Sequence, residues 1–374
     1  MASASRPRCD EFEIAIFTVL KVERDAIEAA LDEEYECDGF VYSRAPSDVN
    51  TYTVGRLGCH HVVLVYLPRM GSMDSAPAAA SMKATFPGIK LALVVGVCGV
   101  NPHLKDEDGH EVLLGDVLIS TAVVMVNSEQ RYPGRLTVWT EIEDVLGRAP
   151  TMIRAFLQKL QGVKTHGRLK NKTTRYANAI VMGLGGRGAY PRTNQDKLFP
   201  TQYRHKHQDP EKCSICARCT VPLHRVCDNA LVSSCGSLGC DDGCLVRRKR
   251  LEDGKRLRLA AFSSNGATGT GDPLQPCIWF GRFSCSEFVL KSGIHRDQVA
   301  RENKIIAFEM EGAGTWDNLP TIIIKGACDY ADSHKNKIWQ PYAATTAAAC
   351  AKAVVEEWRT SQLQPGCRTG VFTT

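Results

Sequence analysis

The stretch that decides the fold is FEIAIFTVLKVERDAIEAALDEEY, residues 12–35. Its opening FEIAIFTVL is a nearly continuous apolar run bounded by charged residues, which is typical of a strand buried on both faces. The following ERDAIEAALDEEY has apolar residues at positions 26, 27, 30 and 31, a spacing that puts them on one face of a helix. The stretch therefore predicts a buried strand followed by a helix.

The same alternation continues along the chain on both sides of a long interruption. Further strands are predicted at 61–67, 91–97, 117–126 and 321–326, and further helices at 74–86 and 341–358. Residues 305–314 are predicted to be a short strand entering a helix. The strand LALVVGV (91–97) is expected to run into a glycine turn, GVCG (96–99). Strands separated by helices predict an α/β protein, a three-layer α/β/α sandwich with a central mixed sheet.

Residues 183–277 interrupt this pattern. They contain GLGGRG, scattered prolines, a cysteine cluster and the basic run RRKRLEDGKRLR (247–258), a composition typical of irregular structure. Because the α/β pattern begins before this region and finishes after it, we predict one domain over residues 1–360, with a cysteine-rich, basic, loop-like insertion at 183–277. Residues 361–374 are predicted to form a C-terminal tail or linker.

The composition narrows the class of protein. With 44% hydrophobic and 23% charged residues, the chain has the balance of an ordinary globular protein. We find neither an apolar run of the ~18 residues that a membrane span needs nor a secretion signal in MASASRPRCD. The formal net charge of +5 is small for 374 residues. We therefore expect a cytoplasmic protein that binds neither nucleic acid nor a membrane.

Two C-terminal segments carry acidic residues directly after predicted strands. In AFEMEGAG, Glu309 and Glu311 flank Met310, and in KGACDYAD, Asp329 and Asp332 follow an apolar strand. Open α/β sheets bind ligands at the carboxyl ends of their strands. A carboxylate there can accept hydrogen bonds from vicinal hydroxyls, and an aspartate can act as a general acid. The alternative is that Glu311 caps a helix and Asp329 begins a turn.

These segments resemble a known family. IIAFEMEGAG (305–314) and IIIKGACDYADSHKNKIWQPYAATTAAACAK (322–352) resemble the C-terminal half of the purine nucleoside phosphorylase and 5′-methylthioadenosine nucleosidase superfamily. Four segments nearer the front are similar in family order: FEIAIFTVLKVERDAI (12–27), LPRMGSMDSAPAAA (67–80), LVVGVCGVN (93–101) and LLGDVLIS (113–120). The chain looks most like the fungal branch, whose members often form the N-terminal domain of larger NLR-type receptors. The resemblance covers nearly everything except the insertion.

The resemblance implies roles for individual residues. Glu311, with Met310 beside it, would hold the 2′- and 3′-hydroxyls of a ribose. Asp329 would protonate, or donate a hydrogen bond to, N7 of the leaving purine, and Glu23 would activate water. The alternative for Glu23 is a solvated glutamate in the first turn of a helix. The segment containing Gly96, Cys98 and Gly99 would lie against the substrate, since glycine lets the backbone approach closely.

Departures from the family pattern favour hydrolysis. Hexameric phosphorylases carry an arginine and a serine for phosphate where this chain has Val94 and Val97, and valines provide none of the charged donors that a phosphate needs. Arg69 could reach the cavity from another loop, so phosphorolysis stays an alternative. Two further departures are Cys285-Ser286-Glu287, where relatives usually have Ser-Gly-Asp, and Cys328, where many have serine.

The sequence thus predicts an N-ribosyl hydrolase that releases a purine base from a nucleoside or nucleotide. Adenine is the base that we expect. The 5′-substituent is left open, and no cofactor is required. Besides a phosphate-dependent phosphorylase, the alternative is a nucleotide-sensing module of a larger receptor that does not turn its ligand over. The family commonly forms homo-oligomers, so we expect a dimer or trimer.

Seven of the sixteen cysteines lie between positions 213 and 244, and the others are scattered. Cys213, Cys216, Cys219 and Cys227 could hold a structural zinc, because a CxxC pair is the usual half of a tetrahedral site. His205 and His207 are further possible ligands, and reduced thiols or disulfides are the alternatives. We interpret the scattered cysteines as buried and reduced. The basic run Arg247–Arg250 is expected to be a solvated loop, with a nuclear signal or a phosphate-binding arm as the alternatives.

Overall fold

The computed structural model of the chain describes residues 6–36, 42–126, 129–132, 135–138, 146–221, 224–254 and 275–358. The predicted tail at 361–374 and part of the predicted insertion, residues 255–274, lie outside the described residues. None of the described helices is long and apolar enough to cross a membrane.

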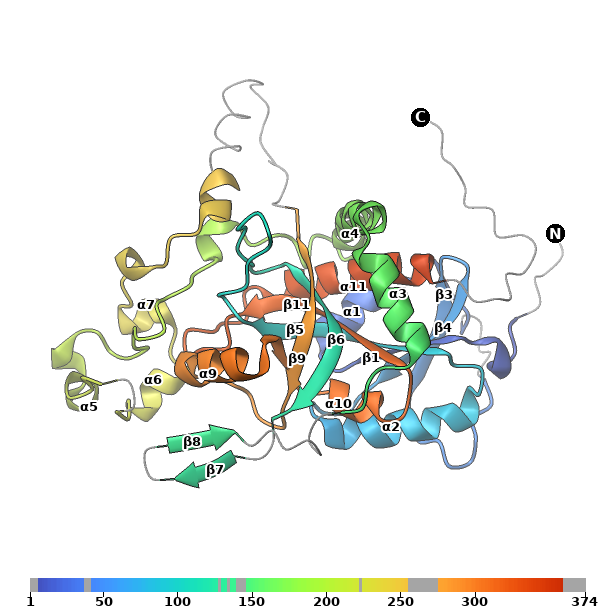
Figure 1. Cartoon of the computed structure of the whole chain (residues 1–374), viewed down its shortest axis with the longest axis horizontal. Helices are drawn as coiled ribbons and strands as arrows, with labels where there is room; N and C mark the ends of the chain where they lie inside the picture. The colour runs from blue at the N-terminus through green and yellow to red at the C-terminus, as the bar shows by residue number, and fades with distance from the viewer. Residues whose placement is uncertain are drawn as a thin grey trace, which may run out of the picture.

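A nine-stranded mixed sheet forms the centre of the molecule (Figure 1). Its order is β10-β9-β6-β11-β5-β1-β4-β3-β2. The strands are β1 (Ile14–Thr18), β2 (Glu33–Glu34), β3 (Tyr52–Leu57), β4 (His60–Tyr66), β5 (Leu91–Val100), β6 (Val117–Met125), β9 (Ile278–Cys285), β10 (Ile305–Glu309) and β11 (Thr321–Asp329). A separate hairpin joins β7 (Glu129–Tyr132) to β8 (Arg135–Val138). Strands β4, β1, β5 and β11 are parallel, whereas β6 runs antiparallel to β11.

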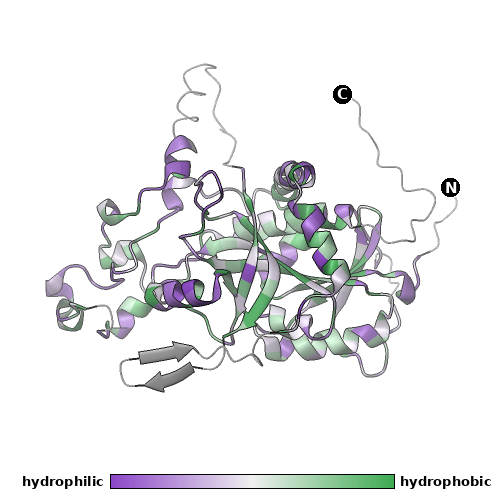
Figure 2. Cartoon of the chain, viewed as in Figure 1, coloured by the Kyte–Doolittle hydropathy of each residue, from purple (hydrophilic) through white to green (hydrophobic). Residues whose placement is uncertain are grey.

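Helices cover both faces of the sheet, which confirms the predicted three layers (Figure 1). One face packs against α1 (Lys21–Glu28), α3 (Thr151–Gln161), α4 (Val163–Gly183) and α11 (Gln340–Glu357). The other packs against α2 (Ser72–Thr85) and α10 (Gly312–Trp316), and α9 (Gly293–Asn303) lies beside β10. Strand β1 shows how the two cores are divided, because Ile14 and Ile16 face the first layer while Ala15 and Phe17 face the second. In Figure 2 the strands and the helix sides turned to them are mostly hydrophobic.

The sheet curls at one end. Strand β10 pairs in parallel with β9 and also antiparallel with the end of β5, where Phe308 lies opposite Gly99. This closure brings the segment after β10 next to the middle of β5. The predicted glycine turn at 96–99 is wrong, because β5 continues as a strand to Val100 and pairs with β11 as far as Gly99.

Two predicted boundaries also differ from the structure. The helix expected over 23–35 ends at Glu28, since residues 33–34 pair with β3 instead. The apolar spacing predicts no helix over 163–183, yet α4 occupies this range. This helix buries only the narrow stripe Leu169, Thr173, Ala177 and Ile180, and its other face is charged. The described part of the insertion has little regular structure: it holds the short helices α5 (Ser214–Ala217), α6 (Asp228–Val232) and α7 (Cys235–Leu238), a helical segment at 249–254 and brief 3₁₀ turns.

The basic run is only in part the solvated loop that its charge predicts, because Arg247 and Lys249 are exposed whereas Arg248 and Arg250 are not. Arg248 is only 4% exposed and donates to the Val112 carbonyl and to the Tyr330 hydroxyl, the latter at 3.0 Å. Arg250 donates to Asp116 Oδ1 at 2.8 Å in a buried ion pair. These arginines are buried because carboxylates and carbonyls of the core lie within reach of their guanidinium groups. They fasten the insertion to the α/β domain.

Candidate active site

A cavity lies at the curled end of the sheet. Six of the residues that the family resemblance singles out line it, namely Glu23, Cys98, Gly99, Met310, Glu311 and Asp329. They come from the start of α1, the end of β5, the β10–α10 connection and the end of β11. Segments more than 300 residues apart in the chain, those of Glu23 and Asp329, thus meet at one place. Strand β10 reaches the cavity antiparallel to β5, so the site is formed by sheet closure and not by parallel strand ends alone.

Glu23 is buried and held in a fixed position. It is 3% exposed, so the alternative of a solvated helix glutamate is wrong. Its Oε2 accepts the backbone N–H groups of Val19 at 3.1 Å and Leu20 at 2.8 Å, and its Oε1 accepts that of Val97 at 2.8 Å. Burial raises the pKa of Glu23 above its ordinary value, the Lys325 ammonium opposes this rise, and the Glu311 carboxylate adds to it.

Gly96 makes room for this carboxylate. A Cβ at Gly96 would lie 2.1 Å from Glu23 Oε1, so no other residue fits without moving Glu23. A Cβ at Gly99 would lie 2.9 Å from the Cβ of Ala331 and 3.0 Å from Asp329 Oδ1. Gly99 lines the cavity, and both glycines are required by the packing of the site's own side chains. The residues that line the cavity do not include Gly96, so the prediction that it lies against the substrate is not met by its position.

Sequence reasoning missed Lys325 in β11. This lysine is 1% exposed, and its Nζ lies 2.8 Å from Glu311 Oε2. Burial alone would lower the pKa of Lys325, but the carboxylates of Glu311, Glu23 and Glu309 raise it well above its ordinary value. A lysine inside the apolar run TIIIKG was the available signal, because a buried ammonium needs carboxylate partners.

The side chain that caps helix α10 is that of Glu309, and not that of Glu311 as the alternative interpretation has it. Glu309 accepts the backbone N–H groups of Glu311 at 3.0 Å and Gly312 at 2.9 Å, which are the first amides of α10. Burial raises the pKa of Glu309, with Lys325 opposing this and Glu311 adding to it. Glu311 makes no side-chain cap hydrogen bond and lines the cavity beside Met310.

Asp329 lines the cavity and also begins a turn. Its Oδ1 accepts the backbone N–H of Ala331 at 2.8 Å, while the Cys328 thiol donates to Oδ2 at 3.3 Å. Lys335 Nζ lies 3.1 Å from the same Oδ2. The cysteine that replaces a serine in this motif therefore still serves as a hydrogen-bond donor. The side chain of Asp329 is oriented from three directions.

The remaining walls of the cavity are mostly apolar. Phe288, Val289 and Leu290 line it together with Phe308 and Met70. Ser286 also lines it, and Glu287 accepts the backbone N–H of Ser72 at 2.9 Å. The loop with the unusual Cys-Ser-Glu sequence therefore closes one side of the cavity. Arg69 lies outside the lining: its side chain is 81% exposed and pairs with Asp74 at 3.1 Å.

The cysteines fall into two kinds of surroundings. Of the scattered cysteines among the described residues, Cys98, Cys285, Cys328 and Cys350 are buried, as interpreted from the sequence. Cys9 and Cys277 are half-buried, and the interpretation is wrong for Cys59, which is exposed. Of the four predicted zinc ligands, Cys213, Cys216 and Cys227 place their sulfurs within 4.8 Å of one another. Cys219 lies outside this group, with its thiol donating to the His224 carbonyl at 3.5 Å. A second group joins His205 to Cys235, Cys240 and His334, and His207 belongs to neither.

Comparison with protein families finds no match for the chain. Among curated proteins, the chain is similar to a nucleotide-binding leucine-rich repeat (NLR)-like protein of Hyaloscypha variabilis, with 27% identity over 359 residues. The match covers 92% of this chain and 29% of the relative, so the chain spans less than a third of that protein's length.

Among solved structures, the chain is similar to a 5′-methylthioadenosine/S-adenosyl homocysteine nucleosidase of Helicobacter pylori, with 13% identity and a TM-score of 0.49. That match covers 93% of this chain and 99% of the nucleosidase. It is also similar to the futalosine hydrolase of Helicobacter pylori, with 14% identity, a TM-score of 0.44 and the same coverage. The NLR-like relative fits the branch that the sequence resembles.

Proposed function

We propose that the chain is an N-ribosyl hydrolase that releases a purine base from a nucleoside. The observation that carries this proposal is that Glu23, Glu311 and Asp329, from three distant segments, line one cavity. Breaking a glycosidic bond requires a proton or hydrogen-bond donor for the leaving base, a group that fixes the sugar, and a base for water. The three carboxyl groups match these three requirements.

Glu23 is the proposed general base. Three backbone N–H groups fix its position, and burial raises its pKa above the ordinary value of a glutamate. A carboxylate with a raised pKa is a stronger base for water than an exposed glutamate. Its hydrogen bond with the Val97 amide holds it against β5. The Glu311 carboxylate is close enough for its negative charge to raise the pKa of Glu23 further.

Glu311 and Asp329 are the proposed groups for the sugar and the base. Lys325 contacts Oε2 of Glu311, and in the proposal Oε1 accepts the 2′- and 3′-hydroxyls of the ribose. Asp329 delivers a proton or a hydrogen bond to N7 of the purine. Its contacts with Ala331 and Lys335 hold the carboxyl group in place for this step.

The lining favours water over phosphate as the attacking group. Among the described residues that line the cavity, Lys335 is the only cationic side chain, and it contacts Asp329 at 3.1 Å. Val97 lines the cavity, whereas Arg69 is exposed and paired elsewhere. A phosphate dianion needs several charge-assisted donors. The apolar wall at Phe288–Leu290 likewise favours an uncharged nucleoside over ATP. Adenine is the proposed base.

Product analysis tests the proposal. Adenosine, inosine, methylthioadenosine and ATP are offered separately, with and without inorganic phosphate, and released base is measured by chromatography. We expect free base without phosphate from at least one uncharged nucleoside. Release that depends on phosphate would make the chain a phosphorylase.

A second candidate rests on the NLR-like relative, of which this chain matches 29%. In that case the cavity binds a purine nucleoside or nucleotide as a signal within a larger receptor. Calorimetric binding without base release, by the wild-type chain under the same conditions, would favour this candidate over the hydrolase.

A further inference from the structure

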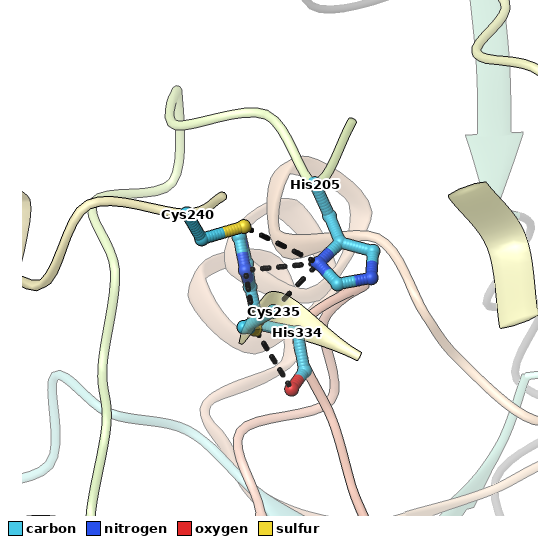
Figure 3. A group of neighbouring side chains, drawn as sticks. All are labelled: His205, Cys235, Cys240 and His334. Carbon is cyan, nitrogen blue, oxygen red and sulfur yellow. Dashed lines mark hydrogen bonds between the residues drawn. The ribbon is translucent and has the colours of Figure 1, made fainter. Parts of the chain in front are cut away.

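Four metal-ligating side chains converge away from the cavity. His205, Cys235 and Cys240 belong to the insertion, and His334 lies in the loop that follows β11. Figure 3 shows the four side chains gathered around one point, with the sulfurs turned toward the imidazole rings. Their ligand atoms all lie within 4.8 Å of one another, and all four residues are buried or half-buried.

We propose that these four residues form a structural Cys₂His₂ zinc site. In a tetrahedron with Zn–N of about 2.0–2.1 Å and Zn–S of about 2.3 Å, the ligand atoms are separated by roughly 3.3 Å for N–N and 3.6 Å for N–S. Here His205 Nδ1 lies 3.2 Å from His334 Nδ1. Cys235 Sγ lies 3.5 Å from His334 Nδ1 and 3.7 Å from His205 Nδ1, and Cys240 Sγ lies 3.8 Å from His205 Nδ1.

The hydrogen bonds that the Nε2 atoms of the two histidines make support a metal ion at their Nδ1 atoms. His205 Nε2 lies 3.0 Å from the Ser233 carbonyl, and His334 Nε2 lies 3.2 Å from the Tyr203 carbonyl. A carbonyl oxygen can only accept, so each Nε2 carries the proton of its neutral ring. When both rings are neutral, their Nδ1 atoms present lone pairs to each other at 3.2 Å, and a metal cation bound by both removes this repulsion. Carbonyl partners of this kind commonly orient metal-bound histidines.

The ligand types select the metal. Two thiolates and two imidazoles suit Zn²⁺, whereas Ca²⁺ and Mg²⁺ prefer oxygen ligands. Four protein ligands complete a tetrahedron and leave no position for substrate water, so the ion is structural and not catalytic. The site is distinct from the group at Cys213, Cys216 and Cys227, which offers three sulfurs and no imidazole.

The position of His334 connects the proposed metal site to the candidate active site. His334 is the residue before Lys335, whose ammonium contacts Asp329 at 3.1 Å. The metal would therefore fasten the insertion to the loop that orients Asp329. Stacking of the Phe199 and His334 rings, with centroids 4.2 Å apart, adds a second contact between the insertion and this loop.

Zinc content per chain tests the proposal. The full chain is purified without chelator, and bound zinc is measured by mass spectrometry for the wild type, for C235S/C240S and for C244S. The control changes an exposed cysteine of the same segment that is not in the group. We expect C235S/C240S to lose one equivalent of zinc and C244S to lose none. Equal zinc in all three proteins, or a disulfide between Cys235 and Cys240 in the wild type, would overturn the site.

X-ray absorption keeps the test valid if C235S/C240S does not fold. In a C213S/C216S background, where the other cysteine group is disabled, zinc added to the protein should be surrounded by two sulfurs at about 2.3 Å and two nitrogens at about 2.0–2.1 Å. Failure of this protein to bind zinc, or a shell of sulfurs alone, would contradict the proposed ligand set.

Discussion

The candidate active site and the Cys₂His₂ group differ in how their polar atoms are satisfied. In the cavity, each key carboxylate already has a donor or a cation: backbone N–H groups for Glu23, Lys325 for Glu311, and Lys335 for Asp329. In the Cys₂His₂ group, ring nitrogens and sulfurs face one another, and no lysine or arginine belongs to the group. The cavity is therefore organised before any ligand arrives, whereas the second group acquires its stable geometry only with an ion.

The two sites also differ in what holds their backbone. The cavity residues stand on β5, β11 and the connections after β1 and β10, which the two hydrophobic cores fix in place. The Cys₂His₂ group stands largely on the insertion, whose own cluster of buried residues contains only Cys216, Cys219, Val226, Ala230 and Leu238. A region with so small a core usually needs a metal or other cross-link to be stable. The following variants test this contrast.

The largest expected effect is that of Asp329→Asn, which should lose base release and keep its zinc. Asp329→Asn keeps the shape of the side chain but removes its acid function, and we expect base release to fall by about 10²–10⁴-fold. Zinc content should stay at the wild-type level, since Asp329 is not a ligand. Turnover and bound zinc are measured on the same preparation. Wild-type turnover in Asp329→Asn would refute the role of this residue.

Removal of the buried cation should destabilise the cavity strongly. Lys325→Met leaves the Glu311 carboxylate buried without its partner, which typically costs about 3–5 kcal/mol. Because Lys325 opposes the raised pKa values of Glu23 and Glu309, these values rise further without it. The folded state then binds more protons than the unfolded state, so the loss of stability is small in acid and grows as the pH rises through the folded pKa values.

Denaturant unfolding at about pH 5 and about pH 7.5 checks this prediction. The matched control is Lys352→Met, because Lys352 Nζ pairs at 2.6 Å with the half-exposed Asp32 and neither residue lines the cavity. Water solvates Asp32 after the change, so we expect a smaller loss of stability that depends little on pH. Equal losses in both variants would mean that the cavity carboxylates do not depend on Lys325.

Metal removal should have an intermediate effect on turnover. In C235S/C240S we expect kcat to fall by about tenfold, since small displacements of a reacting group are costly. The effect should stay below that of Asp329→Asn, because Ala331 still donates to Asp329 Oδ1. C244S serves as the control. Unchanged kcat in a zinc-free C235S/C240S protein would show that the insertion and the cavity act independently.

The smallest expected effect is that of Arg69→Ala. Its side chain is exposed and paired with Asp74 outside the cavity, so kcat/KM should change by less than about twofold. The measurement is made with and without phosphate. A large loss seen only with phosphate would revive phosphorolysis and a role for Arg69 in binding the anion.

Much of the α/β domain could be predicted from the sequence. Apolar runs such as LALVVGV are long enough to identify buried strands, and the acidic residues after them identified Glu311 and Asp329 as site residues. The structure brings these two together with Glu23, Met310, Cys98 and Gly99 around one cavity. Helix α4 was missed because its buried stripe is too narrow to stand out from its charged residues.

Other features depend on tertiary contacts. Charge alone predicts that Arg248 and Arg250 are solvated, yet both find buried partners in segments more than 80 residues away. The CxxC spacing drew attention to Cys213 and Cys216, whereas the group with four ligands takes His334 from a loop nearly 100 residues beyond Cys235. Such pairings have no signature in local spacing.

By itself, the sequence determined the order of strands and helices and the residue types available for chemistry, because periodicity and composition are local properties. Only the tertiary structure decided which of these residues meet. Pairing of β5 with β10 and with β11 placed Glu311 and Lys325 beside Glu23, and folding of the insertion against the loop after β11 placed His334 beside Cys235. The physical reason is that desolvation, ion pairing and metal coordination act through space, between groups that chain distance does not relate.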